Sequence, residues 1–293
     1  MTTGLDGIRE TITSAPLREL IEVFGGRLPD AATGDLLAWL DDFSGEHWDF
    51  RRGRVERHLM GPADLGAIPP AVISRAATAL GLTGTRAPAR ADYSHLLILG
   101  GLGATCLQRA EHAAGLWRSG RVGSPRVTGL GSFRPLHEAE LTVPALTGCR
   151  YEVDAMRVGV RDSFGLADPV EHRGPTGPVT HQSWSITTFE PPSVQVMAAP
   201  SAEPATRRAD TSDTYRFWAR HNSPGPDDTI LIVTSPIYVP FQHADALRLL
   251  TLPYGCTVDT VGLDTGQAIA PERYLQEIRS TVRSLRRLHA VIG

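Results

Sequence analysis

Glycines, hydroxyl groups and arginines follow several apolar segments of this sequence, and together they suit the binding of an anion. The segment HLLILGGLGATCLQR (95–109) is an apolar run that breaks into Gly100, Gly101 and Gly103 and ends in Arg109. A glycine turn leading into a helix leaves backbone N–H groups free to bind a phosphate or another anion. The same turn can also be a tight packing turn without a ligand, and both readings stay open.

The glycine segment matches only half of the dinucleotide-binding fingerprint G-x-G-x-x-G. Gly101 and Gly103 supply the first half, but Cys106 stands where the third glycine should be. The next apolar segment ends in TGLGSFR, which offers no carboxylate for a ribose hydroxyl. An NAD site is therefore not expected, whereas the weaker prediction of an anion site remains.

Polar residues also follow the other apolar segments that we expect to be strands. In an open α/β sheet, ligands bind beyond the carboxyl ends of the strands, so these residues should gather at one edge. The candidate ligand-binding residues are Gly101, Gly103, Arg109, Ser132, Arg134, Thr211, Thr234, Ser235, Tyr238 and Gln242.

Three residues are candidates for acid/base chemistry. Asp213 could act as a general base or hold a ribose hydroxyl, although a carboxylate in the first turn of a helix also suits the helix dipole. His243 lies in SPIYVPFQHAD and has an ordinary pKa near neutrality, but it could equally lie on a helix surface. Glu152 is the third, and its neighbour Asp154 would point to another side of the same helix.

The periodicity of the sequence predicts an α/β domain at 91–293 that follows a helical region at 1–90. In the helical region, the apolar residues of APLRELIEVFGG fall on one helix face. Beyond it, short apolar segments alternate with helices, which predicts a Rossmann-like, mostly parallel sheet with helices on both faces. The expected strands are 95–99, 126–130, 183–189, 193–199, 229–234 and 256–262, the helices are about 104–119, 152–164, 211–221, 241–251 and 271–290, and 168–182 is expected to be a loop.

Composition narrows the classes of protein that we expect. The 293 residues are 41% hydrophobic and 21% charged, which is ordinary for a globular protein. A net charge of −3 gives no reason to expect a nucleic-acid or membrane partner. The three cysteines form no CxxC pair, the ten histidines show no HExxH spacing, and the first residues lack the pattern of a secretion signal. We therefore expect a cytoplasmic protein with a small-molecule partner and no metal; the oligomeric state is not indicated.

Four segments between residues 94 and 265 carry a family resemblance. They are LGS (130–132), YEVDAM (151–156), RADTSDT (208–214) and VTSPIYVPFQHA (233–244). In this order they resemble the SGG-like turn, the acidic helix start, the polar turn and the V-T-S turn of the bacterial domain family that includes SanA, ElyC and YdcF. The last segment departs from the family pattern, because Tyr238 stands where a histidine is common and Phe241 where an arginine is expected.

The resemblance implies a Rossmann-like fold with a ligand across the strand ends, and it matches Glu152, Thr211 and Asp213 to family positions. One branch of that family is associated with S-adenosylmethionine, which makes this compound the cofactor that the resemblance suggests. We thus expect an enzyme that binds a nucleotide-like or phosphorylated small molecule, with Asp213, Glu152 and His243 as its acid/base residues. The alternatives are a phosphoester or diphosphate hydrolase using the same edge, and a non-catalytic ligand-binding accessory protein of a biosynthetic pathway.

Overall fold

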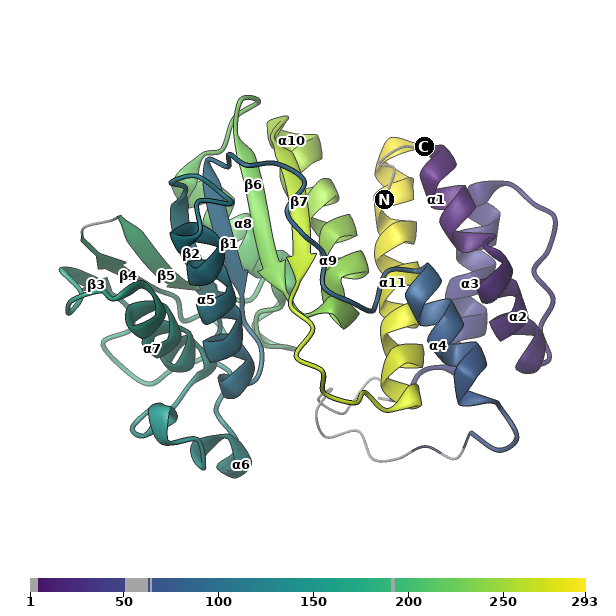
Figure 1. The fold of residues 1–293 in the computed structure, drawn as a ribbon, viewed down its shortest axis with the longest axis horizontal. Coiled ribbons are helices and arrows are strands. Elements are labelled where there is room, and N and C mark those ends of the chain that lie inside the picture. The colour runs from purple at the N-terminus through teal and green to yellow at the C-terminus, as the bar shows by residue number, and fades with distance from the viewer. Residues whose placement is uncertain (1–4, 51–62, 64, 191–192) are drawn as a thin grey trace. The chain divides into compact units, whose positions relative to one another are not determined.

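The chain divides into two compact units in a computed structural model that describes residues 5–50, 63, 65–190 and 193–293. The α/β unit comprises residues 86–235 and 249–263, and the helical unit comprises residues 1–85, 236–248 and 264–293. Figure 1 labels the elements of both units.

The α/β unit is built on a seven-stranded sheet in the described part of the chain, with strand order β3-β4-β5-β2-β1-β6-β7. Neighbours from β5 through β2, β1 and β6 to β7 run parallel, while β4 is antiparallel to both β3 and β5. The predicted mostly parallel, Rossmann-like sheet is confirmed. The strands are β1 (His95–Leu99), β2 (Arg126–Gly131), β3 (Glu171–Arg173), β4 (Ser185–Phe189), β5 (Val194–Ala198), β6 (Thr229–Thr234) and β7 (Thr257–Gly262).

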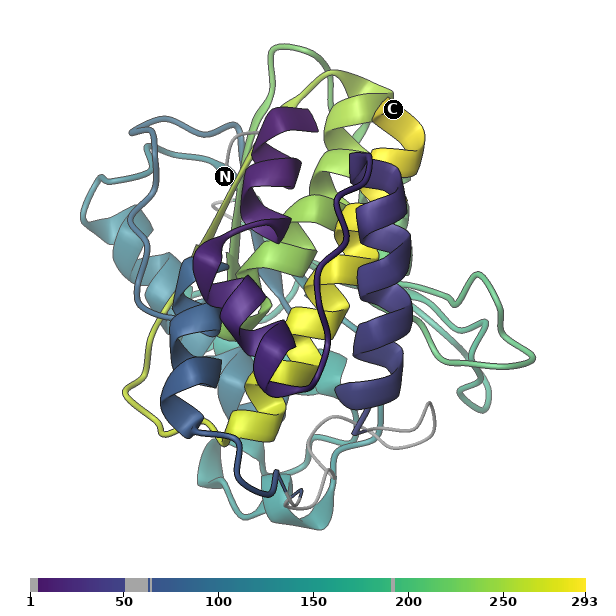
Figure 2. The same cartoon turned by 90° about the vertical axis from the view of Figure 1, so that its right-hand side faces the viewer.

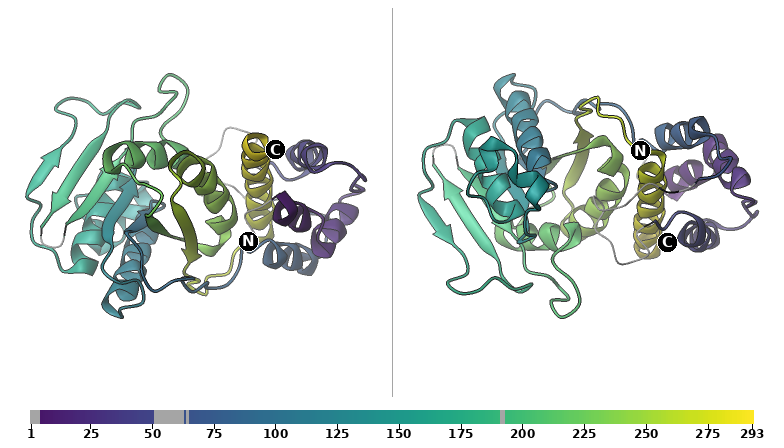
Figure 3. Two further views of the ribbon diagram at one scale, coloured as in Figure 1. Left: turned by 90° about the horizontal axis from the view of Figure 1, so that it is seen from above. Right: turned by 90° about the horizontal axis from the view of Figure 1, so that it is seen from below.

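Helices cover both faces of this sheet (Figure 3). On one face, α5 (Gly103–Arg118) and α7 (Glu152–Phe164) pack side by side over an apolar cluster that includes Leu96 and Val233. On the other face, α8 (Thr211–Asn222) places the ring of Trp218 edge-on to His95, with ring centroids 5.0 Å apart. The shorter helices of this unit are α6 (Glu138–Leu141), η2 (Pro144–Leu146) and α10 (Leu252–Tyr254), and the π-helical turn η4 (Leu247–Thr251) spans the border of the two units.

Strand β3 lies inside the segment 168–182 that we expected to be a loop. Its three residues are exposed, and they pair in antiparallel fashion with residues of β4. An edge strand without a buried face has no apolar alternation, so its sequence carries no strand signal.

The helical unit combines N-terminal helices with two segments from the C-terminal part of the chain. The long helix α11 buries an apolar stripe that includes Leu275, Ile278, Val282 and Leu285 in one core with the N-terminal helices (Figure 2). It packs against α3, α4 and α9, whereas sequence analysis grouped it with the α/β domain at 91–293. The helices are α1 (Leu5–Ile12), α2 (Ala15–Val23), α3 (Thr33–His47), α4 (Pro70–Ala79), η3 (Pro236–Tyr238), α9 (Val239–Ala246) and α11 (Pro271–Ile292).

Within the described ranges, no helix combines the length and the apolar character that crossing a membrane requires.

Candidate functional site

The sheet has a topological switch point between β1 and β6. From β1 the chain forms β2, β3, β4 and β5, which all lie on one side of β1, and it then crosses to the other side of β1 to form β6 and β7. In open α/β sheets, ligands bind in the crevice at such a point, beyond the carboxyl ends of the strands. The glycine turn 100–103 follows β1 and Ser235 follows β6, so both lie at this edge.

Arg109 of α5 joins the two strand ends at the switch point. Its Nη1 donates to the carbonyl oxygen of Leu99 at 2.8 Å, and its Nη2 donates to Ser235 Oγ at 2.9 Å. The residue is 2% exposed. Arg109 therefore holds β1 and β6 together. A ligand would contact its guanidinium group only after the hydrogen bonds to Leu99 and Ser235 rearrange.

Side chains from other parts of the protein pack against the glycine turn. A Cβ on residue 100 would collide with the carboxylate of Glu152, and a Cβ on residue 103 would collide with the side chain of Leu146. The backbone N–H of Gly103, at the N-terminus of α5, donates to Glu140 Oε1 at 2.6 Å. At the N-terminus of α5, where we expected an anion or a packing turn, the carboxylate of Glu140 accepts the hydrogen bond of Gly103.

Arg134 is the centre of a buried group that we call the carboxylate–arginine cluster: Ser132, Arg134, Glu140 and Glu152. The guanidinium binds Glu140 through two nitrogens, with Nη1 2.7 Å from Oε2 and Nη2 2.9 Å from Oε1. Its Nε donates to Glu152 Oε2 at 3.3 Å, and Ser132 Oγ donates to the same oxygen at 3.0 Å. A two-point arginine–carboxylate pair fixes the geometry of both partners.

The two carboxyls of the cluster have different electrostatic surroundings. For Glu140, burial opposes ionisation, but hydrogen bonds from Arg134 and from the N–H groups of His137 and Gly103 bring its pKa down to about 2. For Glu152, burial raises the pKa although Arg134 and Arg208 act in the opposite direction. Glu140 is therefore a fixed anion near neutral pH, and Glu152 is the carboxyl of the cluster that takes up a proton more readily.

Glu140 is not among the site residues predicted from the sequence. The residue lies in the four-residue helix α6, six positions after Arg134, and nothing in HEAEL points to a contact with Gly103. The available signal was the spacing of His137 and Glu140, which together form a capping box at the start of α6. That signal predicts a helix start and says nothing of the partners of the carboxylate.

Asp213 has partners that hold the loop before α8. Its carboxylate accepts hydrogen bonds from the N–H groups of Asp210 and Ala202 and forms an ion pair with Arg207. Asp210 completes a reciprocal capping box, because its own carboxylate accepts from the N–H of Asp213. Thr211 is the first residue of α8. The capping box and the contacts of Asp213 with Ala202 and Arg207 are all made within the protein, without a ligand.

Three of the predicted residues belong to the helical unit. Tyr238 ends η3, and its hydroxyl accepts a hydrogen bond from Arg273 Nη2 of α11 at 3.1 Å. Gln242 and His243 lie on α9, where Gln242 is buried and His243 half-buried. The structure thus brings together, at one edge of the α/β unit, Gly101, Gly103, Arg109, Ser132, Arg134, Glu152 and Ser235.

No group of three His, Cys, Asp or Glu side chains that could hold a metal ion is found among the residues that the structure describes.

Comparison with known proteins places the chain beside mycobacterial relatives. Residues 2–81 match the family model described as the Rv3785 N-terminal domain, and no model of the SanA and YdcF family matches. No solved structure matches the chain. Over 308 aligned positions the chain is 32% identical to "Uncharacterized protein Rv3785" of Mycobacterium tuberculosis (strain ATCC 25618 / H37Rv) and to "Uncharacterized protein Mb3814" of Mycobacterium bovis. These alignments cover 93% of this chain and 85% of each relative. The chain belongs to the family of these mycobacterial Rv3785 proteins.

Proposed function

We propose that the α/β unit binds a nucleotide-like or phosphorylated small molecule at the carboxyl ends of β1, β2 and β6. The observation that carries the proposal is the hydrogen bond between the N–H of Gly103 and the carboxylate of Glu140. It marks the N-terminus of α5, next to the switch point, as a place that holds a negatively charged group.

The ligand's anionic group takes the place of the Glu140 carboxylate. It accepts the hydrogen bond of Gly103 and shares the guanidinium of Arg134, whose Nη1 and Nη2 face Glu140. Glu140 leaves with α6, a helix of only four residues whose Glu138 and Ala139 are exposed. Because the internal carboxylate competes with the ligand, the apparent affinity is lower than that of an open site.

The identity of the ligand rests on the resemblance to the SanA, ElyC and YdcF family, which suggests S-adenosylmethionine. An adenine nucleotide or a sugar nucleotide fits the same anion site, because each carries a phosphate. A hydrolase of a phosphoester or diphosphate is the catalytic form of this proposal, with Glu152 as its proton-exchanging carboxyl.

A non-catalytic binding protein is the second candidate, and one observation favours it. Asp213, which we expected to act as a base, is held by Arg207 and by two backbone N–H groups, and its residue is 4% exposed. A general base must reach the proton that it removes, and these contacts direct the carboxylate toward its own loop.

Thermal-shift measurements test the proposal, with S-adenosylmethionine, S-adenosylhomocysteine, adenine nucleotides, sugar nucleotides and phosphate as the probes. A ligand at 100 times its Kd adds about 2.7 kcal/mol to the unfolding free energy, which raises Tm visibly. We expect Glu140→Ala to unfold at a lower temperature than the natural protein and to respond more strongly to the anionic probes, because the competing carboxylate is gone.

The matched control is Glu138→Ala on the exposed side of the same short helix. It should leave both Tm and the ligand response unchanged. If neither the natural protein nor Glu140→Ala responds to any of the probes, the anion site at Gly103 serves Glu140 alone and the proposal fails. A response to S-adenosylmethionine and S-adenosylhomocysteine alone, without a response to phosphates, would support the methyl-donor form.

A further inference from the structure

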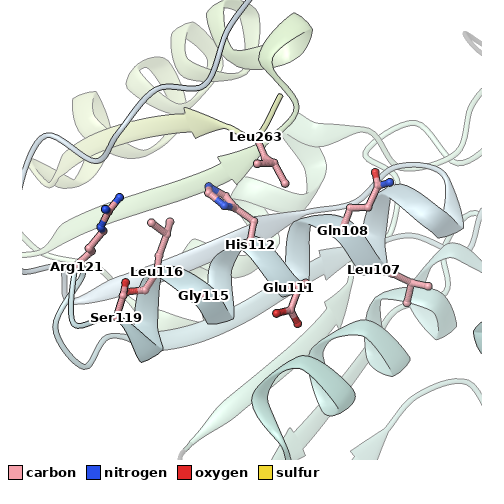
Figure 4. A pocket seen from close by; sticks show the side chains of 9 residues that line it. All are labelled: Leu107, Gln108, Glu111, His112, Gly115, Leu116, Ser119, Arg121 and Leu263. Atoms are coloured by element: carbon pink, nitrogen blue, oxygen red, sulfur yellow. The ribbon is translucent and has the colours of Figure 1, made fainter. Parts of the chain in front are cut away.

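A pocket of about 690 Å³ lies along the flank of α5, away from the glycine turn (Figure 4). Gln108, His112 and Leu116 are spaced four residues apart, so they share one face of the helix. Their side chains extend toward Leu263, which follows β7, and Arg121 extends to the same side from the turn after the helix. The volume is within the range of small-molecule sites, which is about 300–1,000 Å³.

His112 lines this pocket, and one nitrogen of its ring lacks a hydrogen-bond partner among the described residues. Its Nε2 is buried and has no hydrogen-bond partner in the part of the chain that the structure describes. Buried polar atoms are nearly always hydrogen-bonded, so such an atom in the wall of a pocket points to a missing partner. Burial also lowers the pKa of His112, so that the ring is neutral near pH 7.

The charges around the pocket favour a negative group on the ligand. Arg121 is exposed and forms no ion pair within the described ranges. Glu111 lines the pocket from the same helix, but its carboxylate extends away from Leu263 (Figure 4) and forms an ion pair with Arg118 at 2.6 Å. The rest of the lining consists of Leu107, Leu116, Leu263 and Gly115 together with the polar residues Gln108 and Ser119.

We propose that this pocket binds a small organic molecule with a ring-sized apolar body and one anionic group. The apolar body lies between Leu116 and Leu263, a polar atom of the ligand pairs with His112 Nε2, and the anionic group pairs with the guanidinium of Arg121. This site does not depend on the anion site at Gly103, since it uses a different part of α5.

Two fluorescent probes of nearly the same shape test the proposal on the full chain. 1-Anilinonaphthalene-8-sulfonate has an aromatic body and a sulfonate, and N-phenyl-1-naphthylamine has the same body without the charge. We expect the sulfonate probe to bind at one saturable site and more tightly than the neutral probe. Arg121→Gln should lower the affinity for the sulfonate probe about tenfold, because a hydrogen bond to a charged group is lost. It should leave the affinity for the neutral probe unchanged.

Gly115→Leu fills the pocket without a steric conflict. A Cβ at this position meets nothing within 4 Å, and leucine is the better helix former. We expect the variant to fold, with an unchanged or higher Tm, and to bind both probes at least tenfold more weakly. Gly177→Leu is the matched control, because its Cβ also meets nothing within 4 Å but lies in an exposed loop.

Either of two results would overturn the proposal: a natural protein that shows no saturable binding of the sulfonate probe, or a folded Gly115→Leu that binds it as tightly as Gly177→Leu does. If Arg121→Gln lowers the affinity for both probes by the same factor, Arg121 does not bind the anionic group of the ligand. His112→Leu should weaken the sulfonate probe about fivefold, and an unchanged affinity would remove His112 from the site.

Discussion

Glycines and arginines at the ends of strands can either bind a ligand or make contacts that stabilise the fold, and the local sequence is the same in both cases. The glycines after β1 predicted either an anion-binding turn or a packing turn. In the structure Gly100 makes room for Glu152 and Gly103 makes room for Leu146. Arg109 and Arg134 were predicted as ligand contacts. Both are buried, and both donate hydrogen bonds to other side chains of the protein. Residue types and spacing predict where chemistry gathers, but the partner of each side chain depends on contacts that are distant in sequence.

Burial of His95 makes the stability of the protein depend on pH. Burial and the neighbouring Arg126 lower its pKa from 6.5 to about 4, while Asp228 acts in the opposite direction. The unfolded chain therefore binds a proton that the folded protein does not, and stability falls as pH decreases from 6.5 toward 4. We expect this group alone to make the protein about 2 kcal/mol less stable at pH 5 than at pH 7.

Urea unfolding at the two pH values, followed by tryptophan fluorescence, measures the effect, because Trp218 contacts the His95 ring. His95→Gln should lose most of the difference between pH 5 and pH 7, whereas His181→Gln on the exposed surface should keep it. If His95→Gln shows the same pH dependence as the natural protein, burial of this ring does not govern acid stability.

At the scale of elements, alternation of short apolar segments with helices was enough to predict the sheet and the helices that cover it. Short elements without an apolar buried face escaped prediction, and β3 and α6 are the examples, since β3 is exposed and Glu140 is the buried residue of α6. An amphipathic helix reveals that it has a buried face, but it does not reveal which neighbours bury it. For this reason the partners of α11, and the position of α6 against the N-terminus of α5, could not be inferred from the sequence.

The bonds of Glu140 attach α6 to the α/β unit, and they should make the stability of the protein depend on pH. The pKa of Glu140 is about 2 in the folded protein and 4.5 ordinarily, so its contribution to stability is present above pH 4.5 and is lost as pH falls toward 2. Glu152, with its raised pKa, contributes in the opposite direction. We expect the Tm of Glu140→Gln to fall less between pH 5 and pH 3 than the Tm of the natural protein does.

Glu138→Gln again serves as the control, since this side chain is exposed on the same helix. Differential scanning calorimetry at pH 5, 4 and 3 gives the three Tm series. Parallel series for the natural protein and Glu140→Gln would mean that the bonds of Glu140 to Arg134 and Gly103 contribute nothing to the folded state.

At the scale of the whole molecule, the helical unit depends on both ends of the chain. Its core joins residues of α1 to α4 with the apolar stripe of α11, although more than half of the sequence separates them. A chain that ends at residue 263 would leave the buried faces of α3 and α4 without α11. Exposed apolar faces of short helices do not support helix formation in water, because tertiary packing supplies most of their stability.

We therefore expect this truncation to remove more helix than the 22 residues of α11 contain. Circular dichroism at 222 nm measures the loss, and cleavage by trypsin within the first 85 residues should become faster. The α/β unit, which retains all of its strands, should keep its slowly exchanging backbone amides in β1 and β6. A loss of signal equal to that of α11 alone would show instead that the N-terminal helices form a stable core without their C-terminal partner.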